Sequence, residues 1–390
     1  MPDSILIAFD KFKDSMTAAE VTEIVAGKVR KRWPEAKVHT TPLTDGGEGF
    51  AEILTHQVGG SLETINVRGP RFEPLEAQLG WVQVSQLPDA AQLLLAFPAS
   101  VERLAVVEMA QASGIQSVPI DARDARHTTT LGTGQTLFHA AFQKADAILL
   151  GVGGSATSDM GLGALQVMGF ELLDATGAAI ENFTPAAIER IATIRPPKTR
   201  LTIPVRIACD VTNPLTGPNG AAHVFGPQKG LSQDFIPSFD QEIGRVGALL
   251  AKACGLPEDQ SSLPGDGAAG GIAYGLRVAL EAQIVPGFDL VRSWLQLDTR
   301  LAEADLVFTG EGKWDSSSLD GKGPFSVIEA VMDRSMDVYL IGGVVEAEAA
   351  KSVQSKMKGT LNTLELRNPE WSLPKNLENG PERLRELLKL

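Results

Sequence analysis

The residue types best suited to chemistry in this chain are gathered in the loop Gly151–Asp159, which is rich in glycine, serine and acid. It follows the apolar segment Ala147–Leu150 and precedes an amphipathic segment of small residues that begins at Met160. Glycines let a backbone approach a ligand closely, and a helix starting near Asp159 would aim its free N–H groups and positive dipole end at that point. Such a geometry binds phosphate or carboxylate. The loop is not a GxxxxGK[ST] motif, and taken alone it is equally compatible with a tight strand-to-helix turn.

Five more polar loops of similar composition follow apolar segments elsewhere in the chain. The six are Asp10–Met16; Thr44–Gly49; Arg123–Asp124 with Thr128–Thr130 and Gly132–Gly134; Gly151–Asp159; Cys209–Leu215 with Phe225–Gly230; and Thr309–Asp315 with Gly321–Pro324. In open α/β sheets, ligands bind beyond the carboxyl ends of the strands, where such loops gather. Six loops of this kind are difficult to explain as turns alone, so we expect them to form a functional cleft.

The residue types in these loops match the needs of phosphoryl transfer. Glycine N–H groups and lysine bind phosphate oxygens, carboxylates hold Mg²⁺, and one carboxylate can accept the proton of the acceptor hydroxyl. We expect Lys13 and Lys322 to be the important cations, because each lies between a strand and a helix start. Asp45 and Glu48 stand three residues apart at a helix entrance, where they could also cap the helix. Asp210 and Asp315 are further candidates for the metal ligand or the base, and the sequence does not rank these two.

Composition excludes several other classes of function. The net charge of -13 disfavours nucleic acid or an anionic membrane as a partner. Cys209 and Cys254 are the two cysteines, too few for a disulfide framework or a cysteine-based zinc site. The five histidines lack metal-ligand spacing, and no GxSxG nucleophile motif is present. The N-terminus is typical of a first strand rather than a signal peptide, and no apolar run reaches the ~18 residues that span a bilayer. We expect a soluble cytoplasmic protein.

Strand-like and helix-like segments alternate along the chain, which predicts an α/β protein with a largely parallel sheet. The first strand is expected at Ser4–Phe9, and the capping box Thr17–Glu20 predicts a helix whose apolar positions continue to Val29. Further expected elements are a helix over Glu48–Val58, a strand over Leu306–Thr309, a helix over Phe325–Arg334 and a turn or hairpin within Leu87–Ala99. From about Gly69 the pattern changes to short predicted strands joined by turns. The length of the chain predicts two to three domains.

Together these loops resemble the bacterial glycerate kinase family, the type whose fold is unrelated to P-loop kinases. The resemblance covers the chain from Ile5 to about Gly343 and rests on six blocks in order: FDKFKDSMTA, PLTDGGEG, GVGGSATSDMGLGALQVMG, CDVTNPLTGPNGAAHVFGPQKG, GDGAAGG and TGEGKWDSSSLDGKGP. It implies phosphorylation of D-glycerate by ATP and Mg²⁺, with 2-phosphoglycerate favoured over 3-phosphoglycerate as product. It also implies a discontinuous Rossmann-like parallel-sheet domain, residues 1–70 plus 288–390. A second α/β domain, residues 71–287, would be inserted into it, with the active-site cleft between the two.

The same resemblance implies which positions line the site. These are Lys13, Asp45, Gly46, Gly47, Glu48, Gly153, Gly154, Ser155, Asp210, Gly310, Glu311, Gly312, Asp315 and Lys322. We expect Lys13 or Lys322 to neutralise phosphate charge, and Asp45 to be the first choice for general base. Asp210 or Asp315 would bind Mg²⁺, and the glycines with Ser155 would donate N–H groups. Arg68, Arg71 and Arg123 are weaker candidates for the glycerate carboxylate.

The chain departs from the family pattern at four positions. Lys11 and Asp14 replace the usual Ser and Gly, and Lys313 and Ser317 stand where Arg and Gln are common. Lysine keeps the positive charge but lacks the bidentate fork of arginine. A kinase for another small hydroxy acid, or a non-catalytic sensor of a carboxylate or nucleotide, are the alternative functions. The sequence leaves the oligomeric state open.

Overall fold

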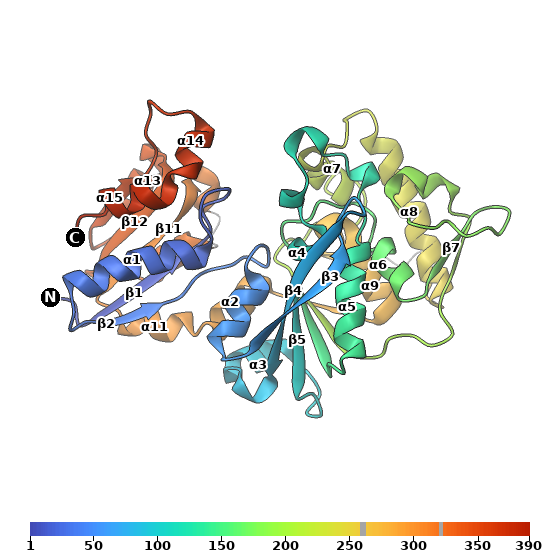
Figure 1. Cartoon of the computed structure of the whole chain (residues 1–390), viewed down its shortest axis with the longest axis horizontal. Helices are drawn as coiled ribbons and strands as arrows, with labels where there is room; N and C mark the ends of the chain where they lie inside the picture. The colour runs from blue at the N-terminus through green and yellow to red at the C-terminus, as the bar shows by residue number, and fades with distance from the viewer. Residues whose placement is uncertain (258–262, 320–322) are drawn as a thin grey trace. The chain divides into compact units, whose positions relative to one another are not determined.

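The computed structural model describes residues 1–257, 263–319 and 323–390, and the chain divides into two compact units (Figure 1). Unit 1 consists of Met1–Asp45 and Val291–Leu390, and unit 2 of Gly46–Leu290. This division differs from the expected boundary between residues 70 and 71. Residues 46–70 group with unit 2 because strand β3 (Ser61–Arg68) pairs along its whole length with strand β4 (Pro74–Gln83) of that unit.

Unit 1 is built on a five-stranded sheet in which every neighbouring pair of strands is parallel. Its strands, in spatial order, are β13 (Leu361–Glu365), β12 (Asp337–Val345), β11 (Leu306–Trp314), β1 (Ser4–Phe9) and β2 (Lys37–Thr40). Numbered within the unit, this order is 2-1-3-4-5, one of the two common doubly wound arrangements. The direction of winding reverses between β1 and β11, and such a switch point is where open α/β sheets bind ligands.

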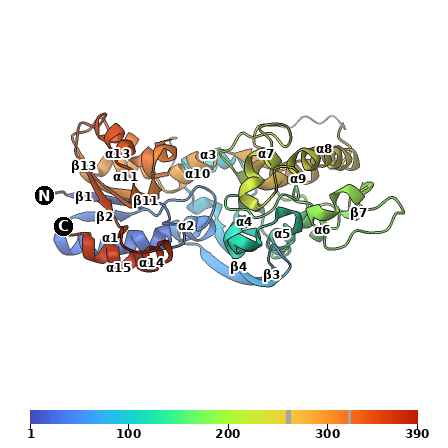
Figure 2. The same ribbon diagram turned by 90° about the horizontal axis from the view of Figure 1, so that it is seen from above.

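Helices cover both faces of this sheet. They are α1 (Ala18–Arg32), α11 (Leu297–Glu303), α12 (Gly323–Glu329), α13 (Ala347–Gln354), α14 (Leu373–Glu378) and α15 (Gly380–Leu387), and α10 (Gly287–Trp294) leads in from unit 2. Figure 2 shows α1 and α15 together on one face, with α11 and α13 on the other. The core between α1 and the sheet contains alternate residues of β1, such as Ile5 and Ile7, packed with Val21 and Val25.

The start of α1 confirms the predicted capping box. The Thr17 side chain accepts a hydrogen bond from the Glu20 N–H at 3.1 Å, and the Glu20 carboxylate accepts one from the Thr17 N–H at 2.8 Å. Two N–H groups at the helix N-terminus are thereby satisfied. This fixes the residue at which the loop following β1 ends.

Unit 2 contains a six-stranded sheet of mixed direction. Its strands, in spatial order, are β10 (Gln283–Val285), β9 (Val205–Ala208), β6 (Ala147–Gly151), β5 (Arg103–Glu108), β4 and β3. The four strands from β10 to β5 run parallel to one another, whereas β4 and β3 are antiparallel additions at one edge. A separate two-stranded sheet pairs β7 (Glu171–Leu173) with β8 (Thr193–Arg195). The sheets of both units therefore confirm an α/β fold with largely parallel sheets.

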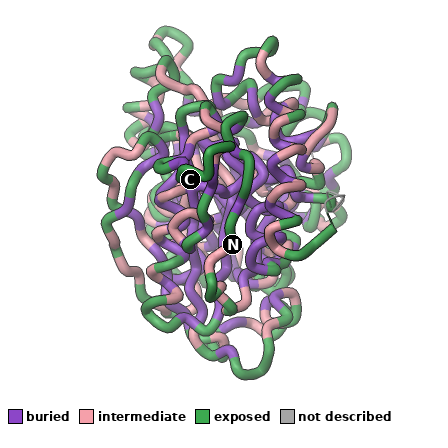
Figure 3. Tube along the Cα trace, turned by 90° about the vertical axis from the view of Figure 1, so that its right-hand side faces the viewer, coloured by how far each residue is buried: buried purple, intermediate pink, exposed green. Residues whose placement is uncertain are grey.

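The helices of unit 2 enclose a large apolar core. They are α2 (Phe50–Gln57), α3 (Asp89–Leu95), α4 (Met109–Ser113), α5 (Leu131–Phe142), α6 (Leu162–Val167), α7 (Ala221–Phe225), α8 (Ile236–Ala253) and α9 (Ala268–Leu280). Residues Ile148 and Leu150 of β6 pack with Phe239 of α8 and Leu276 of α9 in this core. Figure 3 shows buried positions inside and exposed ones along the outer turns. No helix in the described ranges is long and apolar enough to cross a membrane.

Some elements differ from those expected. The segment Leu87–Ala99 contains a helix, α3, rather than a turn or hairpin. Strand β11 runs five residues beyond Thr309, because its ladder with β12 continues from Gly310 to the pair Trp314–Val345. Part of the sixth predicted loop is therefore strand, and the side chains of Glu311 and Lys313 are held by a sheet.

Candidate functional site

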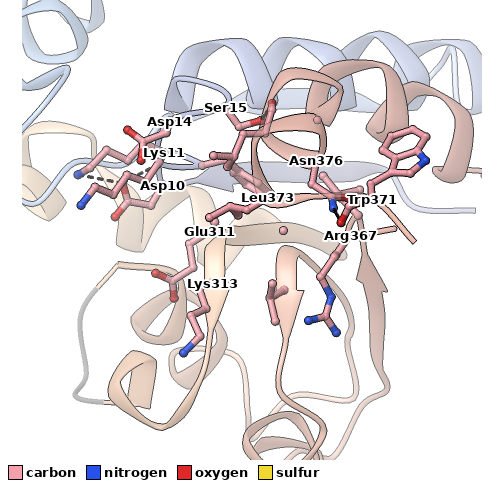
Figure 4. A pocket seen from close by; sticks show the side chains of 18 of the residues that line it. Asp10, Lys11, Asp14, Ser15, Glu311, Lys313, Arg367, Trp371, Leu373 and Asn376 are labelled. Carbon is pink, nitrogen blue, oxygen red and sulfur yellow. Dashed lines mark hydrogen bonds and ion pairs between the residues drawn. The ribbon is translucent and has the colours of Figure 1, made fainter. Parts of the chain in front are cut away.

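Unit 1 has a pocket of about 700 Å³ at the carboxyl ends of its parallel strands (Figure 4). All five strands contribute, either with their last residues or with the loop that follows, β2 through Asp45. The lining residues are Asp10, Lys11, Phe12, Lys13, Asp14, Ser15, Asp45, Glu311, Gly312, Lys313, Gly343, Val344, Leu366, Arg367, Trp371, Leu373, Asn376, Leu377 and Gly380. The pocket thus includes the β1–β11 switch point that the strand order marks as a ligand site.

One end of the pocket is densely charged. The Lys11 ammonium lies 3.4 Å from the Asp45 carboxylate and 3.9 Å from that of Asp10. The Asp45 side chain is 53% exposed, so it remains accessible to a ligand. Lys13 lies in the same loop, and its side chain is exposed at the pocket wall. Two lysines and two aspartates therefore meet within a single loop cluster.

Gly312 allows the loop after β1 to lie directly against β11. Its N–H donates to the Lys11 carbonyl at 3.3 Å, and a Cβ at this position would lie 3.0 Å from the backbone nitrogen of Lys13. A side chain at Gly312 would therefore push the lysine-bearing loop away from the strand. Glycine at position 312 therefore allows the close approach of the two backbone segments.

Glu311 is an acid of the pocket whose pKa is strongly shifted. The pKa of its carboxyl group is raised to about 7, mainly by burial, and the charges of Asp10 and Asp315 add to the rise while the hydrogen bond from Ser318 and the charge of Lys11 oppose it. A carboxyl group with a pKa near neutrality can exchange protons at physiological pH. Perturbed acids in a pocket are candidates for chemistry or for binding a cation.

The described residues offer carboxylates for a magnesium ion but not a complete protein cage. No group of three or more His, Cys, Asp or Glu residues in the described parts of the chain could hold a metal. Magnesium is usually bound by one or two carboxylates together with substrate phosphates and waters. Asp10 and Glu311 in the pocket fit that requirement, since their like charges raise the pKa of Glu311 and a cation would offset this repulsion.

Asp315 is hydrogen-bonded to its neighbours in the chain, and Gly310 packs against the adjacent strand. The Asp315 carboxylate accepts hydrogen bonds from Lys313 at 2.6 Å and from the N–H and hydroxyl of Ser317, and these bonds lower its pKa. Gly310 lies within the sheet, where a Cβ would overlap the Ile341 carbonyl. Neither residue lines the pocket. The predicted cation Lys322 lies outside the described residues.

The other end of the pocket is largely apolar and comes from the segment after β13. Figure 4 shows Trp371 and Arg367 at this end and Asp10 and Lys11 at the opposite one. Arg367 is paired with Glu365 at 2.9 Å. Leu373, the first residue of α14, is 71% exposed although it is a pocket residue.

Unit 2 brings together two predicted loops that are about a hundred residues apart in sequence. The Gly153 N–H donates to the Gly46 carbonyl at 2.9 Å. A Cβ on Gly153 would lie 2.6 Å from the Gly47 nitrogen, and one on Gly154 would lie 2.9 Å from the Glu48 carboxylate. The predicted glycines 46, 47, 153 and 154 and Glu48 therefore form one cluster, and the close approach of Gly153 to the Gly47 backbone requires the absence of a side chain at Gly153.

The Ser155 hydroxyl is hydrogen-bonded to a buried lysine, Lys229, that we did not select from the sequence. Lys229 is 3% exposed and donates to the Ser155 hydroxyl at 2.8 Å and to the Thr157 carbonyl at 2.7 Å. Burial lowers its pKa to about 7, and the charge of Asp159 opposes this shift. Lys229 therefore fixes the conformation of the Gly151–Asp159 loop.

Asp159 is a buried anchor of this loop rather than an exposed ligand. It is 1% exposed and accepts hydrogen bonds from the N–H and hydroxyl of Thr130 at 2.8 and 2.9 Å, and from the N–H groups of Gly161 and Gly163. Burial raises its pKa, and the hydrogen bonds from Thr130 oppose the rise. The helix expected near Asp159 begins three residues later, at Leu162.

Asp210 lies in unit 2 after β9, at the start of α10. Both of its carboxylate oxygens accept from the Phe288 N–H at 3.0 Å. A negative charge at a helix N-terminus is stabilised by the helix dipole. This contact gives Asp210 a structural role, in addition to any role toward a ligand.

Within unit 1 the structure gathers Lys13, Asp45, Glu311 and Gly312, and within unit 2 it gathers the two glycine loops. The sequence did not select Asp10, Arg367, Leu373 or Lys229. Asp10 and Lys229 lie within two of the six polar loops, so the loop pattern contained that signal. Leu373 carried no such signal, because an exposed leucine is ordinary in any sequence.

Comparison with known proteins assigns the chain to a family. The model of the glycerate kinase family matches residues 5–389. The glycerate kinase of Bacillus subtilis (strain 168) is 37% identical over 341 residues, which is 87% of this chain and 84% of that protein. The glycerate 2-kinase of Escherichia coli (strain K12) is 35% identical, over 87% of this chain and 84% of that protein.

A solved structure agrees with this assignment. The crystal structure of a candidate glycerate kinase 2 from Salmonella typhimurium LT2 has a TM-score of 0.73 and 34% sequence identity. It covers 98% of this chain, and the match extends over 95% of that chain. The family match and this solved structure each extend over nearly the whole chain. The chain belongs to the glycerate kinase family.

Proposed function

We propose that this protein transfers the γ-phosphoryl group of ATP to the 2-hydroxyl of D-glycerate, in the presence of Mg²⁺. Membership of the glycerate kinase family makes the chain an ATP-dependent kinase with an alcohol group as acceptor. The proposal goes further in naming the acid and the hydroxyl. The name of the Escherichia coli relative, glycerate 2-kinase, supports the 2-position.

The observation that carries the proposal is the charged end of the unit 1 pocket. Lysine and carboxylate side chains meet there at the carboxyl ends of β1 and β11, where Lys11 and Lys13 can neutralise phosphate oxygens. Asp45 is accessible and is our candidate for the general base that accepts the proton of the hydroxyl. Glu311 is a second candidate, because its pKa of about 7 suits proton transfer near neutrality.

Mg²⁺ would neutralise charge on the transferring phosphoryl group when it is bound. Asp10 and Glu311 are the pocket carboxylates that we expect to hold it. The sequence predicted Asp315 or Asp210 as the metal ligand, and both have carboxylate oxygens that accept hydrogen bonds from neighbouring donors. In unit 2, Gly153, Gly154 and Ser155 remain our candidates for binding an anionic group of a substrate, with Gly46, Gly47 and Glu48 beside them. Gly310 supports the strand that carries Glu311.

The function is tested by measuring ADP release with D-glycerate and a panel of small hydroxy acids. We expect D-glycerate to give the highest kcat/KM, and ³¹P and ¹H NMR of the product to show a phosphate ester at the 2-position. A higher kcat/KM for another acid would assign the protein to that substrate. If no acid supports ADP release while ligands still raise the melting temperature, the protein is a sensor rather than a kinase.

The general base is tested by Asp45→Asn. This change keeps the size of the side chain and removes its ability to accept a proton. We expect kcat to fall by roughly 10²–10⁴-fold at pH 7.5, as is typical for the loss of general acid–base catalysis. Asp14→Asn in the same loop is the matched control, because Asp14 is an exposed pocket residue without an assigned role. Near wild-type turnover of a folded Asp45→Asn protein would transfer the role of base to another group, Glu311 first.

A further inference from the structure

The two ends of the unit 1 pocket differ in chemistry, and this difference bears on which substrate it holds. One end carries Asp10, Lys11, Lys13, Asp45 and Glu311. The lining also has an apolar wall, formed by Val344 and Leu366 at the ends of two strands and by Leu373 and Leu377 of α14. At the end farthest from Asp10, Figure 4 shows Trp371 and Arg367, and Arg367 is paired with Glu365. A three-carbon acid has no apolar part that could cover this wall. A nucleotide has both parts, a polyphosphate and a flat base.

Leu373 is the apolar side chain with the most surface to gain from a ligand. It is 71% exposed, whereas Leu366 is 4% exposed and already belongs to the core beside the sheet. The aromatic neighbour Trp371 is engaged elsewhere, since Lys375 lies 4.5 Å and Arg383 lies 5.6 Å from its ring centre. An exposed leucine on a pocket wall is stabilised when a ligand covers it.

The apolar end is held in place by polar contacts. The Asn376 side chain donates to the carbonyls of Asn368 and Trp371 and accepts from the Asn368 N–H at 2.7 Å, so it braces the turn before α14. The Ser15 hydroxyl donates to the Leu377 carbonyl at 2.7 Å, which ties α14 to the lysine-bearing loop after β1. The two ends of the pocket are therefore fixed relative to each other before a ligand binds, which lowers the cost of binding.

We infer that this pocket is the nucleotide site of the enzyme, with the base against Leu373 and Val344 and the phosphates toward Lys11 and Lys13. The inference rests on the proposed function in taking ATP as the phosphoryl donor. It assigns the donor to unit 1 and leaves the acid to be bound by other groups. The side chain of Asn376 is occupied within the turn, so the base is bound mainly through apolar contact.

The test is Leu373→Asp, which places a carboxylate on the wall that the base would cover. Leu373 is exposed, so the substitution should leave folding intact. We expect the KM for ATP and the calorimetric Kd for ADP to rise about tenfold or more, with the KM for D-glycerate unchanged. The matched control is Leu93→Asp, since Leu93 on α3 is 81% exposed and lines neither this pocket nor the shallow one near Trp81. The control should change neither constant.

The same measurements distinguish a nucleotide bound elsewhere from a protein that does not phosphorylate glycerate. If the wild type phosphorylates D-glycerate but Leu373→Asp changes the KM for glycerate, or neither KM, the nucleotide is not held here. If no acid is phosphorylated, the affinities of the wild type and the variant for ADP still decide whether the nucleotide binds in this pocket. Loss of ADP affinity only in Leu373→Asp supports a nucleotide pocket, and equal affinity in both overturns it.

Discussion

At the scale of single residues, burial strongly shifts the pKa of Glu311 in the unit 1 pocket. Its carboxyl group is partly buried beside Asp10 and Asp315, which raises its pKa to about 7 from 4.5. The folded state therefore holds a proton that the unfolded state releases at lower pH. Such a group destabilises the fold in its ionised form, and it persists in natural proteins mostly where function needs it.

This shift predicts how stability depends on pH. Between about pH 4.5 and 7 the folded state binds more protons at this site than the unfolded state, so the free energy of unfolding falls as pH rises. Glu311→Gln removes the penalty. We expect the variant to match the wild type near pH 4.5 and to exceed it above pH 7, by on the order of 1 kcal/mol after allowance for partial exposure.

Thermal unfolding of both proteins between pH 4.5 and 8.5 provides the measurement. Glu382→Gln on α15, an exposed position of the same unit, controls for the change in net charge. A difference between Glu311→Gln and the wild type that stays constant over this range would mean that the Glu311 pKa is not raised. Activity should also fall in Glu311→Gln if the carboxylate helps to hold Mg²⁺.

At the scale of elements, the loops of both units depend on glycines that admit a neighbouring backbone. Gly153 in the loop after β6 lies against the Gly46–Gly47 backbone, where a Cβ would be 2.6 Å from a nitrogen atom. Gly27 in the middle of α1 is the opposite case, since no atom of the described residues, apart from the backbone of its own helix turns, comes within 4 Å of its Cβ position. The same substitution should therefore have opposite effects at these two positions.

We expect Gly153→Ala to destabilise the protein by roughly 1–3 kcal/mol, because the loop must shift to make room. Gly27→Ala should stabilise it by roughly 0.5–1 kcal/mol, because alanine has the better helix propensity. Chemical denaturation gives both values. Kinetics add a second readout, since Gly153→Ala should also raise a substrate KM. Equal stability changes in the two variants would show that the loop contact is not tight.

Lys229 and Asp159 show how an element can be positioned by buried charge. Neither has a side chain that reaches the surface, yet together they hold both ends of the Ser155–Asp159 segment. A buried lysine is costly unless its donors are satisfied, and here two are satisfied by the loop itself. The loop is consequently preorganised before any substrate arrives.

At the scale of the whole molecule, the two units have separate sheets and separate cores. The cysteines are free, so no disulfide joins them. A ligand that binds the pocket of unit 1 should stabilise that unit by mass action. At 100 times its Kd, ADP should add about 2.7 kcal/mol to the free energy of unfolding of the structure that binds it.

Hydrogen exchange measures this stabilisation by segment. We expect ADP with Mg²⁺ to slow exchange in the loop Asp10–Met16 and in α14, both of which line the pocket. Helix α8 in unit 2 has no residue in the pocket and serves as the internal reference. Protection confined to unit 2 would place the nucleotide outside the unit 1 pocket.

The sequence by itself determined the fold class, the family and most of the polar loops. Local signals were sufficient there: the capping box of α1, the alternation of strands and helices, and loop motifs whose residues are contiguous in the chain. These features depend on neighbours within a few positions, which a single sequence displays directly.

The tertiary structure decided which loops meet and how charged groups behave. That Gly153 touches Gly47, that Lys229 lies under Ser155, and that residues 46–70 pack with unit 2 depend on strand pairing and burial between distant segments. The same is true of the Glu311 pKa and of the exposed Leu373. Burial and long-range packing are properties of the assembled chain, so no local pattern contains them.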